Sequence, residues 1–259
     1  MPYALITGGS KGIGKAIAIE LARRKYDLLL VSRSGTLLQE TAMEISKDYS
    51  VTVNFFIADL SLRDAAHNVH QWCIQNTFNV SVLVNNAGYG LCGLFEEFTL
   101  EEQTNMMQLN MTTVVQFCHL FLPMLKQQSR SYILNVSSTT AYQSLPLMSV
   151  YAASKVFVLN FSRALNYELR LSGVSVTCLC PGSTNTDFVI RAGIGSKALE
   201  TAKKVHMSPG EVAKIGVNAM FAGKAEVITG AINKIGVFLV WLLPKSLVEK
   251  TAARIYSAR

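Results

Sequence analysis

The sequence has little charge and none of the features that mark disordered, repetitive or multi-domain chains. Only 16% of the 259 residues are charged and 50% are hydrophobic, which excludes an intrinsically disordered chain and predicts a well-buried core. No internal repeat, linker or low-complexity segment interrupts the chain. The length and composition therefore predict one compact domain over residues 1–259.

Cysteine is scarce and is not arranged for disulfides or metal binding. The five cysteines are odd in number and lie in apolar surroundings, and only Cys178 and Cys180 are close together, on one face of an expected strand. We therefore expect reduced core thiols, no metal site and a cytoplasmic location. A signal peptide is not expected, because residues 3–6 already read as the first strand and a glycine-rich loop follows at once.

The positive charge is not concentrated in any one segment. Lys and Arg number 24 against 17 Asp and Glu, a net charge of +7, and these residues are scattered along the chain. A solvated surface is the ordinary explanation for such a pattern, with a mild bias towards phosphate-bearing ligands. Nucleic-acid binding would rest on the net charge alone, and we do not expect it.

Short apolar segments alternate with helical segments along the chain. We expect strands at 2–7, 28–31, 51–57, 80–84, 132–136, 174–180 and 225–229, and helices at 15–24, 37–47, 62–75, 100–125, 151–171 and 211–221. This alternation predicts an α/β fold, a doubly wound parallel sheet with helices on both faces. Since ligands bind beyond the carboxyl ends of such strands, the glycine-rich and polar segments at these ends are expected to share one crevice.

The first expected strand leads into a glycine-rich loop, with Gly8, Gly12 and Gly14, and then into a helix. Glycines let the backbone approach a pyrophosphate, and a helix N-terminus supplies amide donors to it. An acidic residue after the second strand would bind ribose hydroxyls, but the chain has Arg33 there. Together with Lys11 in the loop, Arg33 favours the 2′-phosphate of NADP(H) over NAD(H). A glycine-rich turn with two solvated charges is the alternative.

Charge is almost absent between residues 131 and 162, where Lys155 is the only charged residue. Burial of a charged lysine costs free energy, so its presence in a segment suited to burial indicates a structural or functional role. On a helix, Tyr151 lies one turn before Lys155 on the same face, which brings a phenol close to an ammonium group and suggests a proton donor. Ser138, thirteen residues before Tyr151, can reach the same point. If Tyr151 and Ser138 were only core hydrogen-bonding residues, Lys155 would be unexplained.

This ordered set of motifs resembles the short-chain dehydrogenase/reductase family, in its single-domain branch, over residues 3 to about 190. The residues that carry the resemblance are Thr7, Gly8, Gly12, Ile13, Gly14, Asp59, Asn85, Asn86, Ala87, Gly88, Asn110, Ser138, Tyr151, Lys155, Pro181, Gly182 and Thr186. Each motif alone is weak, but their order and spacing together are specific.

The resemblance implies a Rossmann fold and a role for each matching residue. Tyr151 would be the general acid or base, Ser138 would orient the substrate carbonyl, and Asn110 would anchor a water in a proton relay. Lys155 would hold the nicotinamide ribose and lower the pKa of Tyr151. The cofactor would be held by Gly8, Ser10, Lys11, Gly12, Ile13, Gly14, Arg33, Asp59, Leu60, Asn86, Ala87, Gly88, Pro181, Gly182 and Thr186, together with Tyr151 and Lys155.

The combined features predict an NADP(H)-dependent oxidoreductase that interconverts a ketone or aldehyde and an alcohol on an apolar small molecule. The alternative is a non-catalytic NADP(H)-binding sensor or scaffold on the same fold. Residues 185–206, with weak periodicity and several glycines, are expected to form a lid over the substrate. The nearly uncharged outer side of the helix from Tyr151 suggests a homodimer. A tetramer is in doubt, because the glycine-rich segment often found after the last strand of the family is missing.

The C-terminal extension, residues 231–259, includes an apolar run at 236–243. As a helix this run would span about 12 Å, too short for the ~30 Å core of a bilayer, so we expect no transmembrane segment. We expect the run to pack against the fold. The alternatives are a wall of the substrate pocket, or contact with a membrane surface aided by Lys245, Lys250 and Arg254.

Overall fold

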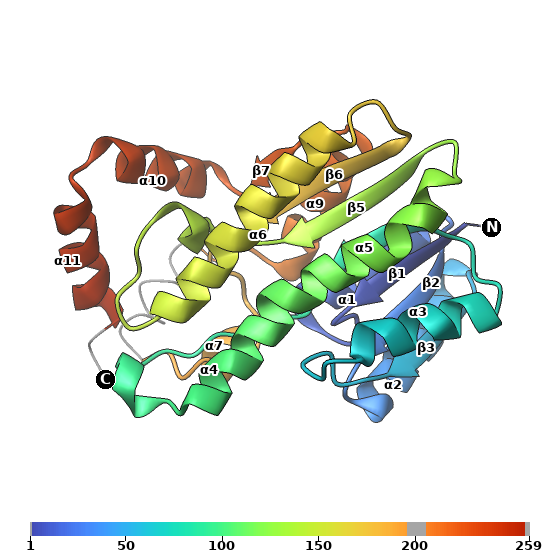
Figure 1. The fold of residues 1–259 in the computed structure, drawn as a ribbon, viewed down its shortest axis with the longest axis horizontal. Coiled ribbons are helices and arrows are strands. Elements are labelled where there is room, and N and C mark those ends of the chain that lie inside the picture. Colours follow the sequence, from blue (N-terminus) through green and yellow to red (C-terminus); the bar gives the residue numbers. More distant parts are fainter. Residues whose placement is uncertain (1, 196–205, 257–259) are drawn as a thin grey trace.

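One parallel sheet of seven strands runs through the molecule (Figure 1). The computed structural model describes residues 2–195 and 206–256. Its strands are β1 (Tyr3–Thr7), β2 (Asp27–Ser32), β3 (Val53–Ile57), β4 (Val80–Asn85), β5 (Ser131–Val136), β6 (Val174–Cys180) and β7 (Glu226–Ile228). They lie in the order β3-β2-β1-β4-β5-β6-β7. The predicted doubly wound α/β fold is confirmed.

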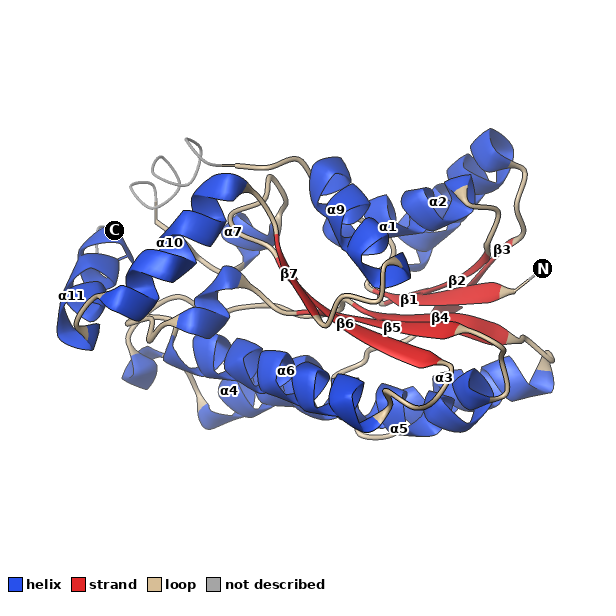
Figure 2. Ribbon diagram, turned by 90° about the horizontal axis from the view of Figure 1, so that it is seen from above, coloured by secondary structure: helices blue, strands red, loops and turns tan. Residues whose placement is uncertain are grey.

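Helices cover both faces of this sheet (Figure 2). One face carries α1 (Gly12–Arg23), α2 (Gly35–Tyr49) and α9 (Pro209–Phe221), and the other carries α3 (Ala65–Gln75), α5 (Thr113–Lys126) and α6 (Ser149–Glu168). Every residue of the central strands β4 and β5 is buried. Burial on both faces explains why these strands are apolar almost throughout instead of alternating. The sheet therefore separates two hydrophobic core clusters.

The strand order reverses between β1 and β4, which lie side by side although β2 and β3 separate them in the sequence. Loops that leave these two strands in opposite directions open a crevice at their carboxyl ends. The glycine-rich loop follows β1, and residues 86–88 follow β4. The fold thus places two of the predicted cofactor-binding segments at one point.

The long helix expected at 100–125 is interrupted in the structure. Its two regular parts, α4 (Leu100–Met107) and α5, are joined by a π-helical turn, Gln108–Thr112. Asn110 lies in this turn, where its Nδ2 donates a 2.9 Å hydrogen bond to the Tyr89 carbonyl. A π-turn adds one residue to the helical repeat and often occurs at functional sites, because it redirects a side chain.

Two helices, α10 (Ala231–Leu242) and α11 (Lys245–Tyr256), follow β7 and lie at the end of the molecule away from the N-terminus (Figure 1). The expectation that residues 236–243 pack against the fold is confirmed only in part, because α10 contacts the segment Thr139–Tyr142 but has no fully buried residue. Only its inner side, with Asn233, Val237 and Val240, is half-buried. Within the described residues, none of the helices is both long and apolar enough to span a membrane.

Candidate active site

A pocket of about 840 Å³ opens at the carboxyl ends of the strands. Of the predicted site residues, it is lined by Gly8, Ser10, Lys11, Gly12, Ile13, Arg33, Asp59, Leu60, Asn86, Ala87, Gly88, Ser138, Tyr151, Lys155, Pro181, Gly182 and Thr186. Gly14 and Asn110 do not line it. One crevice therefore collects residues from six loops that lie far apart in the sequence.

The glycine-rich loop bends sharply beneath the pocket. Gly8 and Gly12 adopt left-handed φ angles of +66° and +57°, which favour glycine. Gly14 has a different reason to be glycine, since a Cβ there would lie 2.1 Å from the Gly8 carbonyl oxygen. The Asn86 amide fixes the loop from β4 by donating to the carbonyls of Thr7 and Gly8 at 3.0 and 3.2 Å.

The N-terminus of α1 is suited to bind an anion. Lys11, Gly12 and Ile13 line the pocket, the Lys11 side chain makes no capping hydrogen bond, and the first turn carries no acidic residue. The first amide groups of the helix and its dipole are therefore available to a phosphate. Glycines that leave room for close backbone approach and an uncapped helix start fit a dinucleotide cofactor.

Replacing Gly14 with Ala is expected to displace this loop. The added methyl group would overlap the Gly8 carbonyl, and we expect a loss of ~3 kcal/mol in unfolding free energy together with weakened dinucleotide binding. Urea unfolding and titration with NADPH measure the two effects. Gly210→Ala is the matched control, because no atom lies within 4 Å of a Cβ at that position. Equal stability of the two variants would contradict the close contact.

The two predicted phosphate-binding cations lie at the rim of the pocket, each beside an acid. Arg33 Nη1 is 3.5 Å from Asp59 Oδ2, and Lys11 Nζ is 2.7 Å from Asp187 Oδ2. All four side chains are more than a third exposed, so these pairs are weak and an anionic ligand can compete for the cations.

Sequence reasoning missed a third cation, Arg191, which also lines the pocket. Burial and the neighbouring Arg33 lower its pKa.

Tyr151 is buried at the inner end of the pocket, in the first turn of α6. Burial raises its pKa above the usual 10, and a hydrogen bond with Ser138 only partly opposes this effect. In the protein without cofactor, desolvation of the phenolate dominates. The lowering of this pKa by Lys155 beside a bound nicotinamide stays a prediction. The phenol is held protonated at neutral pH, which suits a proton donor.

Ser138 ends the segment after β5, and its backbone is extended. Its Oγ accepts a 3.1 Å hydrogen bond from the Thr140 backbone amide, which fixes the side chain. The hydroxyl group is thereby presented to Tyr151 across the pocket. The predicted pair of hydroxyl groups is brought together as the spacing suggested.

Lys155 lies one turn after Tyr151 and is 6% exposed. Its Nζ donates a 3.1 Å hydrogen bond to the Val136 carbonyl and lies 5.7 Å from the centre of the Tyr151 ring. Burial lowers the pKa of this lysine to about 8. The ammonium group thus faces the pocket with one protein acceptor and two further N–H donors for a ligand.

Lys155→Met is expected to raise the stability of the cofactor-free protein at neutral pH by about 2 kcal/mol. Burial of the ammonium group costs ~3 kcal/mol, and its hydrogen bond to the Val136 carbonyl offsets ~1 kcal/mol of this cost. The folded pKa lies below the unfolded value, so the unfolded chain binds more protons between them. Wild-type stability therefore rises relative to the variant from about pH 8 to about pH 10.5.

Urea unfolding of both proteins across this pH range measures the difference, with the exposed Lys214→Met as control. A wild type more stable than Lys155→Met at neutral pH would contradict the cost of burial.

Asn110 is buried behind the pocket and links three segments. Its Nδ2 donates to the Tyr89 carbonyl at 2.9 Å and to Ser154 Oγ at 3.1 Å, while its Oδ1 accepts from the Tyr89 amide at 3.2 Å. Ser154 Oγ in turn donates to the Tyr151 carbonyl at 2.7 Å. Asn110 therefore holds the first turn of α6 in place; its part in a water relay stays a prediction.

The wall of the pocket beside Tyr151 is apolar, and sequence reasoning missed most of it. Met148, Phe188, Ile194 and Tyr256 line it, and the rings of Phe188 and Tyr151 lie 5.4 Å apart. Tyr256 comes from the inner face of α11, about a hundred residues from Tyr151, and no local pattern marks it. Of the predicted lid, residues 185–195 border the pocket through α7 (Phe188–Arg191); residues 196–205 lie outside the described part.

The five cysteines are all buried, and none of them forms a disulfide. Cys178 Sγ and Cys180 Sγ are 3.8 Å apart, on one face of β6 as alternation predicts. Within residues 2–195 and 206–256, no three His, Cys, Asp or Glu side chains form a group that could hold a metal ion.

Comparison with known proteins identifies relatives of this architecture. The sequence profile of the short chain dehydrogenase family matches residues 2–195. Hydroxysteroid dehydrogenase-like protein 1 of Gallus gallus is 32% identical over 80% of this chain and 61% of its own length, so the chain spans less than two thirds of that relative. The 17-beta-hydroxysteroid dehydrogenase type 3 of Mus musculus is 32% identical over 90% of this chain and 76% of its own length.

Among solved structures, a short-chain dehydrogenase from Sphingobium yanoikuyae in complex with NADPH superimposes with a TM-score of 0.81. It is 28% identical to this chain, and the match covers 93% of this chain and 94% of that protein. The likeness therefore includes almost the whole fold described above.

Proposed function

Since the chain belongs to the short-chain dehydrogenase/reductase family, we propose that it is an NADP(H)-dependent oxidoreductase that interconverts a ketone or aldehyde and an alcohol on an apolar small molecule. The observation that carries the proposal is the meeting of Ser138, Tyr151 and Lys155 at one wall of the pocket, reached from the same crevice as the glycine-rich loop. A protein that only bound the cofactor would not need this protonated phenol beside a hydroxyl.

The proposed mechanism assigns one task to each of these side chains. Tyr151, whose pKa burial raises, donates its proton to the carbonyl oxygen of the substrate. Ser138 orients that oxygen by a second hydrogen bond. Lys155 binds the ribose hydroxyls of the cofactor through its free N–H donors and stabilises the phenolate after proton transfer. A nicotinamide cofactor held by the glycine-rich loop and Lys155 would supply the hydride for the carbonyl carbon. In the oxidative direction the Tyr151 phenolate, stabilised by Lys155, takes the proton of the alcohol.

The apolar inner end of the pocket supports an apolar substrate. Met148, Phe188, Ile194 and Tyr256 offer a large hydrophobic surface and few polar groups, apart from the Tyr256 hydroxyl. The names of two relatives refer to hydroxysteroids, which are apolar molecules with a secondary alcohol. We propose a substrate of this type, a rigid or long apolar ketone.

A panel of ketones and aldehydes, followed by the absorbance of NADPH, tests the function. We expect turnover of bulky apolar ketones and little turnover of small polar carbonyls, because only the former fill the apolar end of the pocket. A thermal-shift comparison of NADPH with NADH gives the cofactor preference independently. Cofactor binding without turnover of any carbonyl would favour the sensor or scaffold alternative.

Homodimer formation and a cytoplasmic location are further parts of the proposal. Beside the exposed Ala153 and Asn160, α6 carries half-buried Phe157 and Phe161, whose rings stack at 6.0 Å, and a helix side of this kind favours a second copy. Five buried cysteines without a disulfide favour a reducing compartment. Light scattering of the purified protein measures the oligomeric state.

A further inference from the structure

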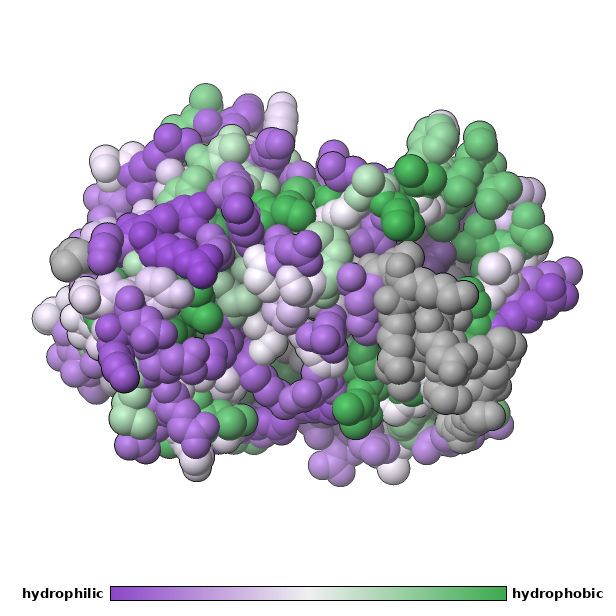
Figure 3. Space-filling view, turned by 180° about the vertical axis from the view of Figure 1, so that it is seen from behind, coloured by the Kyte–Doolittle hydropathy of each residue, from purple (hydrophilic) through white to green (hydrophobic). Residues whose placement is uncertain are grey.

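The outer half of α10 is apolar except for Lys234 in its first turn. At 100° per residue, Ile232, Ile235, Phe238, Leu239, Trp241 and Leu242 fall within an arc of about 180°. Their side chains are 63, 59, 58, 45, 79 and 62% exposed. Figure 3 shows the resulting hydrophobic patch at the upper right of the molecule. Contiguous apolar patches on soluble proteins mark sites of interaction with proteins or membranes.

The first turn of α10 is firmly attached to the fold. Asn233 Nδ2 donates a 2.7 Å hydrogen bond to the Thr229 carbonyl at the end of β7. The same amide packs so closely on Gly182 that a Cβ there would lie 2.2 Å from it. The inner side of α10 is thus held against the loop after β6. Its apolar outer half faces solvent and contributes little buried apolar surface to the fold.

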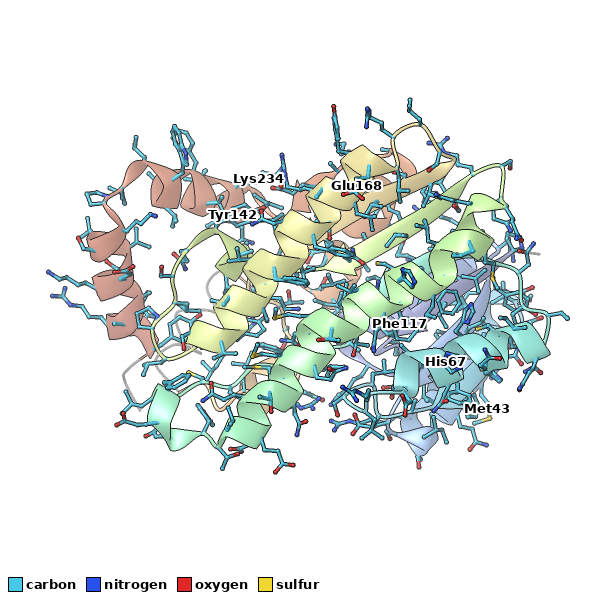
Figure 4. The ribbon with its side chains drawn as sticks, viewed as in Figure 1. Met43, His67, Phe117, Tyr142, Glu168 and Lys234 are labelled. Atoms are coloured by element: carbon cyan, nitrogen blue, oxygen red, sulfur yellow. The ribbon has the colours of Figure 1, made fainter. Side chains whose placement is uncertain are left out.

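Cations accompany this patch. Residues 231–256 contain Lys234, Lys245, Lys250 and Arg254 and a single acid, Glu249. Lys234 projects from the beginning of α10 in Figure 4. On α11 the helical spacing places Leu247, Lys250 and Arg254 on the outer face, all exposed, while Ala252 and Tyr256 face the fold. The apolar outer half of α10 and the basic outer face of α11 form one end of the molecule, which we call the terminal face.

We propose that the terminal face binds the surface of an anionic lipid bilayer. An apolar helix side next to cations is the composition of helices that lie in the plane of a membrane interface. With 12 residues, α10 is about 18 Å long and lies in the interface instead of crossing it. A second copy of the chain is a poorer fit, because it would offer the same excess of cations, whereas an anionic surface is complementary in charge.

Fluorescence of Trp241 reports directly on insertion. The chain has two tryptophans, and the other, Trp72, packs against Phe56 and Phe78 in the fold, so the full-length Trp72→Phe variant leaves Trp241 as the single reporter. Vesicles of phosphatidylcholine and phosphatidylglycerol in equal parts are expected to shift its emission to shorter wavelength. Phosphatidylcholine brominated in its acyl chains is expected to quench it. An unchanged spectrum with both vesicles would overturn the proposal.

Vesicle flotation of full-length variants separates the apolar and the electrostatic contributions. Phe238→Ser with Trp241→Ser is expected to lower the partition coefficient about tenfold or more. Lys250→Gln with Arg254→Gln is expected to lower it roughly fivefold per charge, and only on the anionic vesicles. Leu171→Ser is the control, because Leu171 is 91% exposed but lies on the turn after α6.

Each variant is checked for an unchanged thermal shift with NADPH, which tests that the fold and the cofactor site are intact. Light scattering without vesicles measures the oligomeric state, and so tests whether a second copy of the chain covers the terminal face instead of a membrane. A dimer that dissociates on Phe238→Ser with Trp241→Ser, together with no vesicle binding by the wild type, would assign the terminal face to a second copy and overturn the proposal.

Discussion

Tyr151→Phe is expected to lower kcat for carbonyl reduction about 10³-fold, the usual contribution of a positioned general acid. The variant lacks only the hydroxyl group, so its ring still packs against Phe188 and the pocket keeps its shape. Because burial keeps the Tyr151 phenol protonated at neutral pH, the wild type has a proton ready for the carbonyl oxygen. Without it, the developing alkoxide must take a proton from water. NADPH affinity is expected to change little.

The measurements are kcat with the best ketone of the panel and the Kd for NADPH from its fluorescence. Tyr89→Phe is the matched control, since the Tyr89 hydroxyl donates to the Glu102 carbonyl outside the pocket. This control should retain wild-type kcat. A Tyr151→Phe enzyme with more than about a tenth of wild-type kcat would exclude Tyr151 as the general acid. Loss of NADPH binding in that variant would instead indicate a role for Tyr151 in holding the cofactor.

Arg33→Asp is expected to reverse the cofactor preference, with a change of about 10²- to 10³-fold in the ratio of kcat/KM for NADPH to that for NADH. A charge-assisted contact of a guanidinium with the 2′-phosphate contributes about 1.5–3 kcal/mol, and a carboxylate in its place adds repulsion. The same carboxylate can accept hydrogen bonds from the ribose hydroxyls of NADH. Arg33 can be replaced without loss of a strong contact, since it is half exposed and the ion pair that it forms with Asp59 is weak.

Steady-state kinetics with both cofactors measure the ratio. Arg170→Asp is the control, because Arg170 follows α6 at the opposite end of the sheet and makes the same change of charge. If the ratio of kcat/KM for NADPH to that for NADH changed equally in both variants, the change would be an effect of the net charge of the protein and not of a contact at Arg33. An unchanged ratio in Arg33→Asp would place the 2′-phosphate elsewhere on the rim, and Arg191 would be the next residue to test.

The sequence alone was sufficient to predict the sheet, the crevice and the polar side chains within it. Each strand is a short apolar run, and the carboxyl ends of parallel strands meet at one edge, so residues after β1, β2, β4, β5 and β6 had to converge. The prediction that Tyr151 and Lys155 lie close together is confirmed, because residues four positions apart share a helix face. These features depend on local pattern and on rules that hold for all parallel sheets.

The tertiary structure decided what local pattern does not encode. Asn110 lies in a π-turn, where its side chain hydrogen-bonds to Tyr89 and Ser154, and Tyr256 reaches the pocket from a helix far along the chain. The pKa of Tyr151 is set by how completely the fold removes water from the phenol. An apolar composition predicts burial only if another element covers it. No described element covers the outer half of α10, so the same residues that suggested packing form a surface instead.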